Sequence, residues 1–492
     1  MELTGLDIDI GTRTPTVLLN SADASDLGAH PLDRVHITHD DRVTTGIVEV
    51  TDELVGAGEL GVTRPLGHIT GTVDVTLATR PDSVAYLKKK LDGIELELSE
   101  LRAIVRDINR DRLNDVELSA FVAGVYTNGM SRQEMIALTE CMVAVGETMR
   151  WDSTPVVDKH SIGGVAGNRV TPIIVPILAA AGLTIPKTSS RAVTSAAGTA
   201  DTVEVFCDVD FSLAEIEEIV AETNGCMVWG GAVNLSPVDD KIIRAETPLS
   251  LDPPGQVIAS VLSKKKSAGA TNVVIDIPYG EGAKVESLSE AREMAEDCRH
   301  VGERLGMAVD CAITRGEQPI GQGIGPVLEA RDVLAVLQGG GPASLRQKSE
   351  RLSQILLDGA GVTEAASDIL DSGRAEAKFR EIVAAQGGDP DVTVADLDPG
   401  PVDTTVTADR DGVVTHVDNA LVNELARRAG APKDHRAGIL LHCRTGDEVG
   451  VGDDLLTLYA EKAEKLDQAR SLLEETAPIR VLRSGDVLVE RW

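Results

Sequence analysis

The chain has 492 residues, too many for a single hydrophobic core, because such cores stop growing at roughly 250 to 300 residues, so about three or four domains are expected. Its formal charge is −32, from 79 acidic and 47 basic residues, of which 15 are lysine. An acidic chain without a basic stripe argues against a nucleic-acid partner, and the hydrophobic fraction of 42% argues against disorder. Without a secretory signal or an uncharged apolar stretch of about 18 residues, the chain is expected to be soluble and cytoplasmic, with no membrane partner.

The first part of the chain changes from a strand pattern to a helix pattern. Residues 1–84 contain short β-rich runs such as PTVLL and RVHITH, separated by Gly, Asp and Pro, which predict an N-terminal β-rich domain. Residues 85–153 show helical periodicity and predict a helical domain. Within it, Gly129 ends one helix, and Ser131 with Glu134 forms the capping box of the next.

The remaining chain predicts two further domains. Over residues 154–395, β-branched apolar runs alternate with helical patterns, which indicates an α/β domain with a mainly parallel sheet. Residues 237–268 interrupt it with a helical stretch that we assign to the helical domain, so the α/β domain is discontinuous. Residues 396–492 mix strands with one helix and predict a C-terminal α+β domain. The predicted fold class is therefore multidomain α/β.

A first loop of small residues, DKHSIGGVAGN from Asp158 to Asn168, follows the predicted strand PVVD. Such a loop between a strand and a helix directs backbone N–H groups at an anion, and glycines allow the anion a close approach. Lys159 adds a positive charge and Ser161 a hydroxyl group. The alternative is a tight turn with an incidental lysine, so the loop alone leaves a phosphate site undecided.

A second loop, TSSRAVTSAAGTAD from Thr188 to Asp201, contains six hydroxyl residues and Arg191. Hydroxyl groups and an arginine suit a phosphorylated or polyhydroxyl ligand, although an ordinary polar loop has the same composition. The carboxyl ends of parallel strands meet at one edge of a sheet, where open α/β sheets bind their ligands. Two such loops one βα unit apart therefore favour one anion site more strongly than either loop alone.

The remaining candidates are less specific. Asp252, in SLDPPGQV, is most simply a helix N-cap before a first-turn proline, or else a general acid if burial raises its pKa. The lysine run Lys264–Lys266 fits an exposed helix face. The six cysteines are scattered without a CxxC pair, so no structural metal is predicted.

These motifs resemble a known family. DKHSIGG and SSRAVTSAAGTADTVE are similar to the two phosphate-side signatures of the thymidine phosphorylases, and KIIRAETPLSLDP, IASVLSKK and GEQPIGQGIGPVLEARDVL resemble later family segments. The resemblance covers the chain from about residue 85 onward. Ser195, Ala196 and Ala197 stand where the bacterial pyrimidine enzymes carry a His and a Gly pair. With the added N-terminal domain, this departure resembles the archaeal AMP phosphorylase branch.

The resemblance implies a glycosyltransferase (pentosyltransferase) that cleaves AMP with inorganic phosphate to adenine and ribose 1,5-bisphosphate in nucleotide salvage, with CMP and UMP as further substrates. Phosphate is then a co-substrate, no cofactor is needed, and a homodimer or larger homo-oligomer is expected. Two alternatives remain open: a pyrimidine nucleoside (thymidine) phosphorylase, and a non-catalytic nucleotide-binding protein on the same scaffold.

The resemblance also implies roles for individual residues. Asp252 would be the proton donor, and Lys159, Ser161 and Ser189 would bind inorganic phosphate. His160, Arg244 and Lys264 align with substrate-side positions of the pyrimidine enzymes. The nucleotide would be bound by Gly164, Ser190, Arg191, Ala192, Val193, Thr194, Ser195, Thr199, Ser260 and Lys284.

Overall fold

The computed structural model describes residues 1–12, 14–192 and 195–483. It divides the chain into two compact units, one formed by Met1–Val145 and Pro237–Ser260, the other by Gly146–Ser236 and Val261–Trp492. Among the described residues, each of the main hydrophobic clusters is formed by side chains of one unit. The multidomain α/β fold class predicted from the sequence is confirmed.

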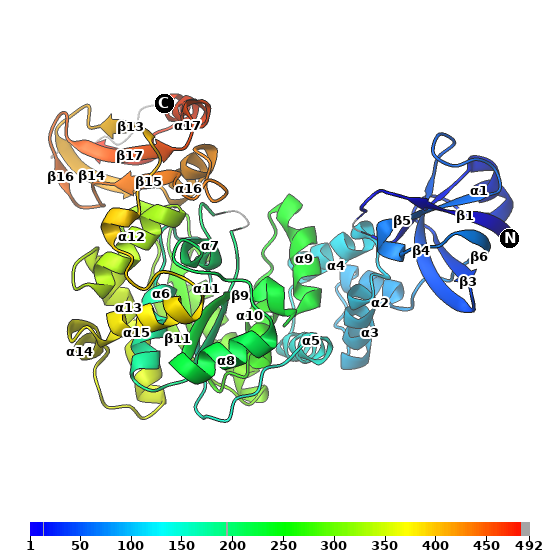
Figure 1. Cartoon of the computed structure of the whole chain (residues 1–492), viewed down its shortest axis with the longest axis horizontal. Coiled ribbons are helices and arrows are strands. Elements are labelled where there is room, and N and C mark those ends of the chain that lie inside the picture. The colour runs from blue at the N-terminus through cyan, green and yellow to red at the C-terminus, as the bar shows by residue number, and fades with distance from the viewer. Residues whose placement is uncertain (13, 193–194, 484–492) are drawn as a thin grey trace. The chain divides into compact units, whose positions relative to one another are not determined.

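The first unit begins with a closed six-stranded barrel in the strand order β1-β5-β2-β4-β3-β6 (Figure 1). Its pairs β1–β5 and β2–β4 are parallel, and the others are antiparallel. Apolar side chains that alternate along the strands, such as Val35 and Ile37 of β3, fill the interior. The elements are β1 (Glu2–Ile8), β2 (Thr16–Leu19), α1 (Ser21–Leu27), β3 (Arg34–His39), β4 (Arg42–Val50), β5 (Glu59–Thr63) and β6 (Gly71–Leu77).

A helical bundle completes the first unit. The predicted helix boundary is confirmed, since Gly129 follows the last residue of α4 and the Ser131 hydroxyl accepts from Glu134 N at 3.2 Å. Val238 and Ile242 of α9 pack into the same core as Phe121 of α4. The elements are α2 (Ser83–Leu91), α3 (Leu98–Asn109), α4 (Asp115–Asn128), α5 (Arg132–Val145), α9 (Pro237–Glu246) and α10 (Pro254–Ser267), the last of which continues into the second unit.

The second unit is built on parallel strands. The strands β11, β10 and β7 form one sheet, β8 pairs with β9, and a parallel bridge from Val156 to Thr184 links the two sets. The mainly parallel sheet is thus confirmed, but the sequence did not predict β8, β9 or β11. The elements are β7 (Val157–Ser161), α6 (Thr171–Ala180), β8 (Ile185–Ser189), α7 (Thr199–Val203), α8 (Leu213–Thr223), β9 (Gly225–Trp229), β10 (Asn272–Tyr279), α11 (Leu288–Arg304), β11 (Ala308–Arg315), α12 (Pro326–Leu337), α13 (Ala343–Gly359), α14 (Ala366–Asp371) and α15 (Arg374–Ala385).

The C-terminal part of the second unit has two small sheets, β12-β15-β17-β13 and β16-β14-β18 (Figure 1). The sequence predicted one helix in this part; the structure has two, and α16 is the one that was missed. The elements are β12 (Gly323–Ile324), β13 (Val402–Thr407), β14 (Gly412–Val417), α16 (Asn419–Arg428), β15 (Gly438–Leu441), β16 (Glu448–Val449), β17 (Asp454–Ala460), α17 (Ala463–Glu475) and β18 (Ile479–Leu482).

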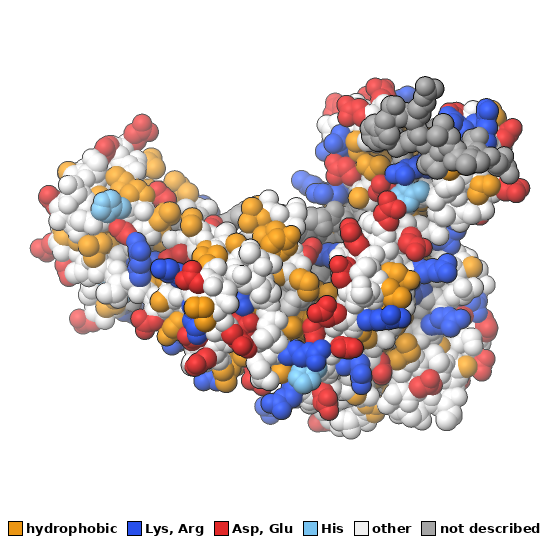
Figure 2. Space-filling view, turned by 180° about the vertical axis from the view of Figure 1, so that it is seen from behind, with side chains coloured by type: hydrophobic (Ala, Val, Ile, Leu, Met, Phe, Trp, Pro, Cys, Tyr) orange, Lys and Arg blue, Asp and Glu red, His pale blue; other side chains and the backbone are white. Residues whose placement is uncertain are grey.

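The surface carries the acidic excess of the composition. On the face drawn in Figure 2, acidic side chains are spread over the surface with basic side chains among them. None of the helices in the described part of the chain is long and apolar enough to cross a membrane. Within residues 1–12, 14–192 and 195–483, no three His, Cys, Asp or Glu side chains are grouped so as to hold a metal ion.

Candidate active site

The first candidate loop starts later than the sequence suggested. Lys159 and Ser161 belong to strand β7 itself, because β7 remains paired with β10 as far as Ser161, which lies opposite Asp276. The expectation that both residues lie in the loop after the strand is therefore wrong. The loop proper consists of residues 162–168, and the lysine and the serine lie beneath it in the sheet.

Gly164 allows the first loop to lie against the segment that contains Lys284. Its φ is +86°, and a Cβ atom there would stand 2.4 Å from the backbone nitrogen of Lys284. A larger residue would have to push that backbone away. Two predicted nucleotide contacts, Gly164 and Lys284, are thus neighbours in the structure.

A buried carboxylate, Asp276 of β10, accepts hydrogen bonds and forms an ion pair beneath the first loop. The hydroxyls of Ser161 and Thr314 each donate to it at 2.6 Å, and Lys348 Nζ lies 2.8 Å from it. Burial by itself would raise the pKa of Asp276, but Lys348 and Lys159 outweigh this effect and hold that pKa below its ordinary value. Asp276 is therefore ionised and orients the groups around it.

A second buried carboxylate, Asp158 of β7, is shared by two lysines. Lys265 Nζ lies 2.7 Å from one of its oxygens, and Lys187 Nζ lies 3.7 Å from the other. Burial, with the nearby ammonium of Lys265, lowers the pKa of Lys187 to about 7. Lys187 therefore changes its charge near neutral pH. Burial likewise places the pKa of Lys159 well below its ordinary value.

These groups place four lysines and two carboxylates inside the α/β domain. The buried lysines are Lys159, Lys187, Lys265 and Lys348, and the facing carboxylates are those of Asp158 and Asp276. Burial lowers the pKa of Lys159, Lys187 and Lys348, so a bound anion, which favours the charged forms of these lysines, would be stabilised by the cluster. The buried hydroxyl oxygen of Ser189, at the end of β8, also has no hydrogen-bond partner among the described residues.

The titration of Lys187 should make both folding stability and anion binding depend on pH. Because its folded-state pKa of about 7 lies below the ordinary 10.5, the folded protein binds fewer protons than the unfolded chain between these values, and stability rises with pH through that window.

Binding of a fixed dianion should show the opposite trend, because it favours charged Lys187. We expect sulfate to raise the melting temperature more at pH 6 than at pH 9, at constant ionic strength, and Lys187→Met to remove most of this difference. An equal sulfate effect at both pH values would contradict the assignment.

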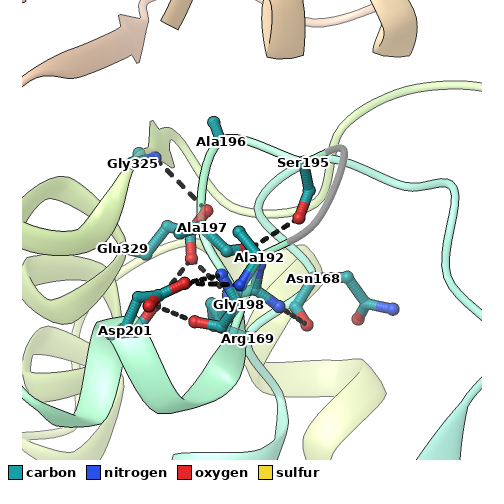
Figure 3. Close-up of polar contacts among 12 residues, drawn as sticks. Asn168, Arg169, Ala192, Ser195, Ala196, Ala197, Gly198, Asp201, Gly325 and Glu329 are labelled. Atoms are coloured by element: carbon teal, nitrogen blue, oxygen red, sulfur yellow. Dashed lines mark hydrogen bonds and ion pairs between the residues drawn. The ribbon is translucent and has the colours of Figure 1, made fainter. Parts of the chain in front are cut away.

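The second candidate loop is fixed by polar contacts at its base (Figure 3). One oxygen of Asp201 accepts from the backbone N–H groups of Ala192 and Gly198, both at 2.7 Å. Arg169, which follows the first loop, donates to the carbonyl of Ala197 and pairs with the buried Glu329 of α12. The two candidate loops are therefore connected through the Arg169 side chain.

The side chain of Arg191 is engaged within the protein. Its guanidinium donates to both carboxylate oxygens of Glu204, at 2.6 and 2.7 Å, and lies over the ring of Trp229 at 5.2 Å from the centroid. The hydrogen bonds from Arg191 to Glu204 raise the pKa of the guanidinium above its ordinary value. A phosphate group that used this guanidinium would have to displace Glu204.

The other predicted residues of the second loop differ in exposure. Ser190 is exposed, the Ser195 hydroxyl donates to the carbonyl of Ala197 at 2.9 Å, and Thr199 is the first residue of α7. Val193 and Thr194 lie outside the described residues.

Two predicted residues belong to the first unit, apart from the loops. Asp252 is exposed, and it is not the N-cap that the sequence suggested: α10 begins at Pro254, and the carbonyl of Pro253 accepts from Val257 N at 3.0 Å. The Ser260 hydroxyl donates to Asp239 at 2.9 Å. The structure thus brings together the predicted residues of the α/β domain, while Asp252 and Ser260 stand in the other unit.

The sequence interpretation missed several residues of the charged network. Lys187, Lys348, Asp276 and Arg169 were not singled out. Asp276 is a lone carboxylate in the otherwise apolar strand NVVIDIP, and Lys348 lies between the buried Leu345 and Leu352 positions of α13 at helical spacing. Both patterns place a charged group on a buried face, which is the signal that identifies them.

Comparison with protein-family models gives three matches. The helical bundle domain of a glycosyl transferase family matches residues 84–146, and the a/b domain of the same family matches residues 153–383. The C-terminal domain of pyrimidine nucleoside phosphorylases matches residues 413–480. Among solved structures, an anthranilate phosphoribosyltransferase from Thermus thermophilus is similar in fold, with a TM-score of 0.51 and 19% identity over 61% of this chain and 99% of that chain.

Similarity to curated proteins extends over the full length. An AMP phosphorylase of Natronomonas pharaonis is 61% identical over 100% of both chains. That of Thermococcus kodakarensis is 47% identical over 96% of both, and that of Methanosarcina barkeri is 44% identical over 98% of this chain and 97% of its own. With matching fold, matching domain models and this identity throughout, the chain belongs to the AMP phosphorylase family of glycosyl transferases.

Proposed function

We propose that this protein is an AMP phosphorylase, which cleaves AMP with inorganic phosphate to adenine and ribose 1,5-bisphosphate. The support is the full-length similarity to AMP phosphorylases at 44 to 61% identity, together with a site in the α/β domain suited to phosphate. CMP and UMP are further proposed substrates.

The observation that carries the proposal is the buried excess of lysines under the first loop. A phosphate dianion bound there would favour the charged forms of Lys159 and Lys187, which lie beside the ion pairs of Asp158 and Asp276 with Lys265 and Lys348. It also supplies an acceptor for the unpartnered hydroxyl of Ser189. The bond-forming phosphate oxygen is held here, at the carboxyl ends of β7 and β8, where α/β sheets bind ligands.

In the proposed reaction, a phosphate oxygen forms a bond to C1′ of the ribose while the bond from C1′ to the base nitrogen breaks. Positive charge develops on the ribose and negative charge on the departing base. The phosphate dianion stabilises the first, and a proton delivered to the base neutralises the second. Asp252 is the proposed donor of that proton; because its side chain is exposed in this structure, the proposal requires that the bound nucleotide shield it from water.

The second loop is the proposed site of the nucleotide, including its 5′-phosphate. Asp201 and Arg169 hold the loop at its base through the Ala192 and Gly198 N–H groups and the Ala197 carbonyl. The remaining backbone N–H and hydroxyl groups of the loop are the proposed donors to the ligand. Ser260 and Lys284 are the proposed further contacts. Because Arg191 is engaged by Glu204, the backbone of the loop rather than this guanidinium is the proposed main phosphate contact.

The proposed reaction needs no organic cofactor and no resident metal ion, since phosphate is the nucleophile. We place the enzyme in the cytoplasm as a homodimer or larger homo-oligomer, with a role in nucleotide salvage.

A substrate panel tests the proposal. We expect adenine release from AMP that depends on phosphate, with much slower release from adenosine, which lacks the 5′-phosphate. Phosphate-dependent cleavage of thymidine or uridine without cleavage of AMP would instead assign the protein to the pyrimidine nucleoside phosphorylases, with which its C-terminal domain shares a model. Binding of AMP without any phosphate-dependent turnover would assign it to the non-catalytic alternative.

A further inference from the structure

Helix α16 of the C-terminal domain contacts the first loop through a buried asparagine. Asn419 is 1% exposed, and its side-chain oxygen accepts from the backbone N–H of Ala166 at 3.1 Å. Its side-chain nitrogen donates to the carbonyl of Gly316, which follows β11, at 2.8 Å. Both ends of the amide are therefore satisfied by loops at the carboxyl edge of the parallel sheet.

One helical turn later, Asn423 makes the corresponding contact with the second loop. Its side-chain oxygen accepts from the backbone N–H of Ala196 at 3.1 Å, and its side-chain nitrogen donates to the backbone carbonyl of Asn419 at 3.0 Å. Residues four apart on a helix are displaced by about 6 Å along its axis and lie on one face. A single rigid turn of α16 thus spans the two loops.

Apolar packing supports the same contact. Ala166 and Ala196 are 3% and 0% exposed, and both belong to the hydrophobic core that contains Val422 and Leu425 of α16. The loops therefore insert a small side chain each into the core of the C-terminal domain. Asp201 and Arg169 fix the second loop at its base, whereas α16 fixes it near its tip.

We propose that Asn419 and Asn423 are positioning residues through which the C-terminal domain sets the spacing between the phosphate loop and the nucleotide loop. Neither side chain contacts substrate in this account. The contact between Asn419 and Ala166 joins residues 253 positions apart in the sequence, and the contact between Asn423 and Ala196 joins residues 227 positions apart. The expected effect on catalysis rests on the proposed function, whereas the role of the two asparagines in fixing the loops does not.

Asn423 is the position to test, because it is only half-buried, whereas replacing the buried Asn419 risks general unfolding. Asn423→Leu keeps the size of the side chain but removes the acceptor for Ala196 N–H. Asn423→Asp keeps an acceptor for the Ala196 N–H but loses the donor to the Asn419 carbonyl. Val422→Ala, on the same helix, reduces the apolar packing of the C-terminal core and leaves the amide groups of Asn419 and Asn423 in place.

Two readouts are measured on the full-length variants. In hydrogen exchange, the peptide containing Ala196 should exchange about five-fold faster in Asn423→Leu, the effect of losing one hydrogen bond, and should stay protected in Asn423→Asp. In kinetics, we expect KM for AMP to rise about ten-fold in Asn423→Leu, with a smaller change in kcat and recovery in Asn423→Asp.

The inference is overturned if Asn423→Leu leaves the exchange of the Ala196 peptide at the wild-type rate, or if Val422→Ala changes exchange and KM to the same extent. If the wild-type protein does not cleave AMP, the proposed function fails, and the exchange measurement still decides whether Asn423 fixes the loop.

Discussion

Replacing Asp252 by asparagine should lower kcat for AMP phosphorolysis by about 10²- to 10⁴-fold, the usual contribution of a positioned general acid. Asparagine keeps the shape of the side chain but cannot deliver a proton to the departing base. Because Asp252 is exposed and asparagine has nearly the same shape, the replacement should leave the folded structure intact. The measurement is steady-state kcat at saturating AMP and phosphate, with the melting temperature of both proteins.

Asp240→Asn is the matched control, since Asp240 is an exposed carboxylate of α9 in the same unit and outside the proposed site. It should retain the wild-type kcat. A proton donor role for Asp252 is contradicted if Asp252→Asn turns over at a rate similar to that of the wild type, or if both variants lose activity equally.

Replacing Lys159 by methionine should weaken the use of phosphate without lowering the melting temperature of the phosphate-free protein. The ammonium group is buried, with a pKa that burial holds well below its ordinary value. Loss of a hydrogen bond to a charged group costs about 1.5 to 3 kcal/mol, so kcat/KM for phosphate should fall by roughly 10- to 150-fold. The folded protein loses a buried amine whose charged form burial disfavours, while Asp276 keeps Lys348 as a partner. Its melting temperature without phosphate should therefore stay the same or rise.

Lys433→Met provides the control, because Lys433 is exposed in the C-terminal domain and outside the lysine cluster. It should change neither quantity. A fall in the melting temperature of Lys159→Met that accounts for its lost activity, or an unchanged kcat/KM for phosphate, would refute the binding role of Lys159.

Much of the fold could be predicted from the sequence because it is encoded locally. The capping box at Ser131 marks a helix start that the structure confirms, and the alternation of apolar runs and helices predicts the parallel sheet. Strand β8 was missed because IPKTS contains a lysine and a threonine, Lys187 and Thr188, that become buried only through tertiary packing. Helix α16 was missed although its buried apolar positions, Val422, Leu425 and Ala426, recur at helical spacing in the sequence.

The candidate site could be predicted only in part. The two loops have a local composition that indicates an anion site, and the structure connects them through Arg169. The charged network is not local: Lys265 reaches Asp158 from 107 residues away. Neither spacing nor periodicity specifies such a pair, because it depends on how distant segments pack. The contacts of Asn419 and Asn423 could not be predicted for the same reason, because they join segments that are distant in the sequence.

The most direct test of the central claim is to identify the products formed from AMP and inorganic phosphate by ³¹P NMR, with adenine measured in parallel. The proposed phosphorolysis predicts one phosphate consumed and one ribose 1,5-bisphosphate formed for each adenine released, with no reaction when phosphate is omitted. Adenine release that continues without phosphate and yields ribose 5-phosphate would show hydrolysis instead, and would contradict the account.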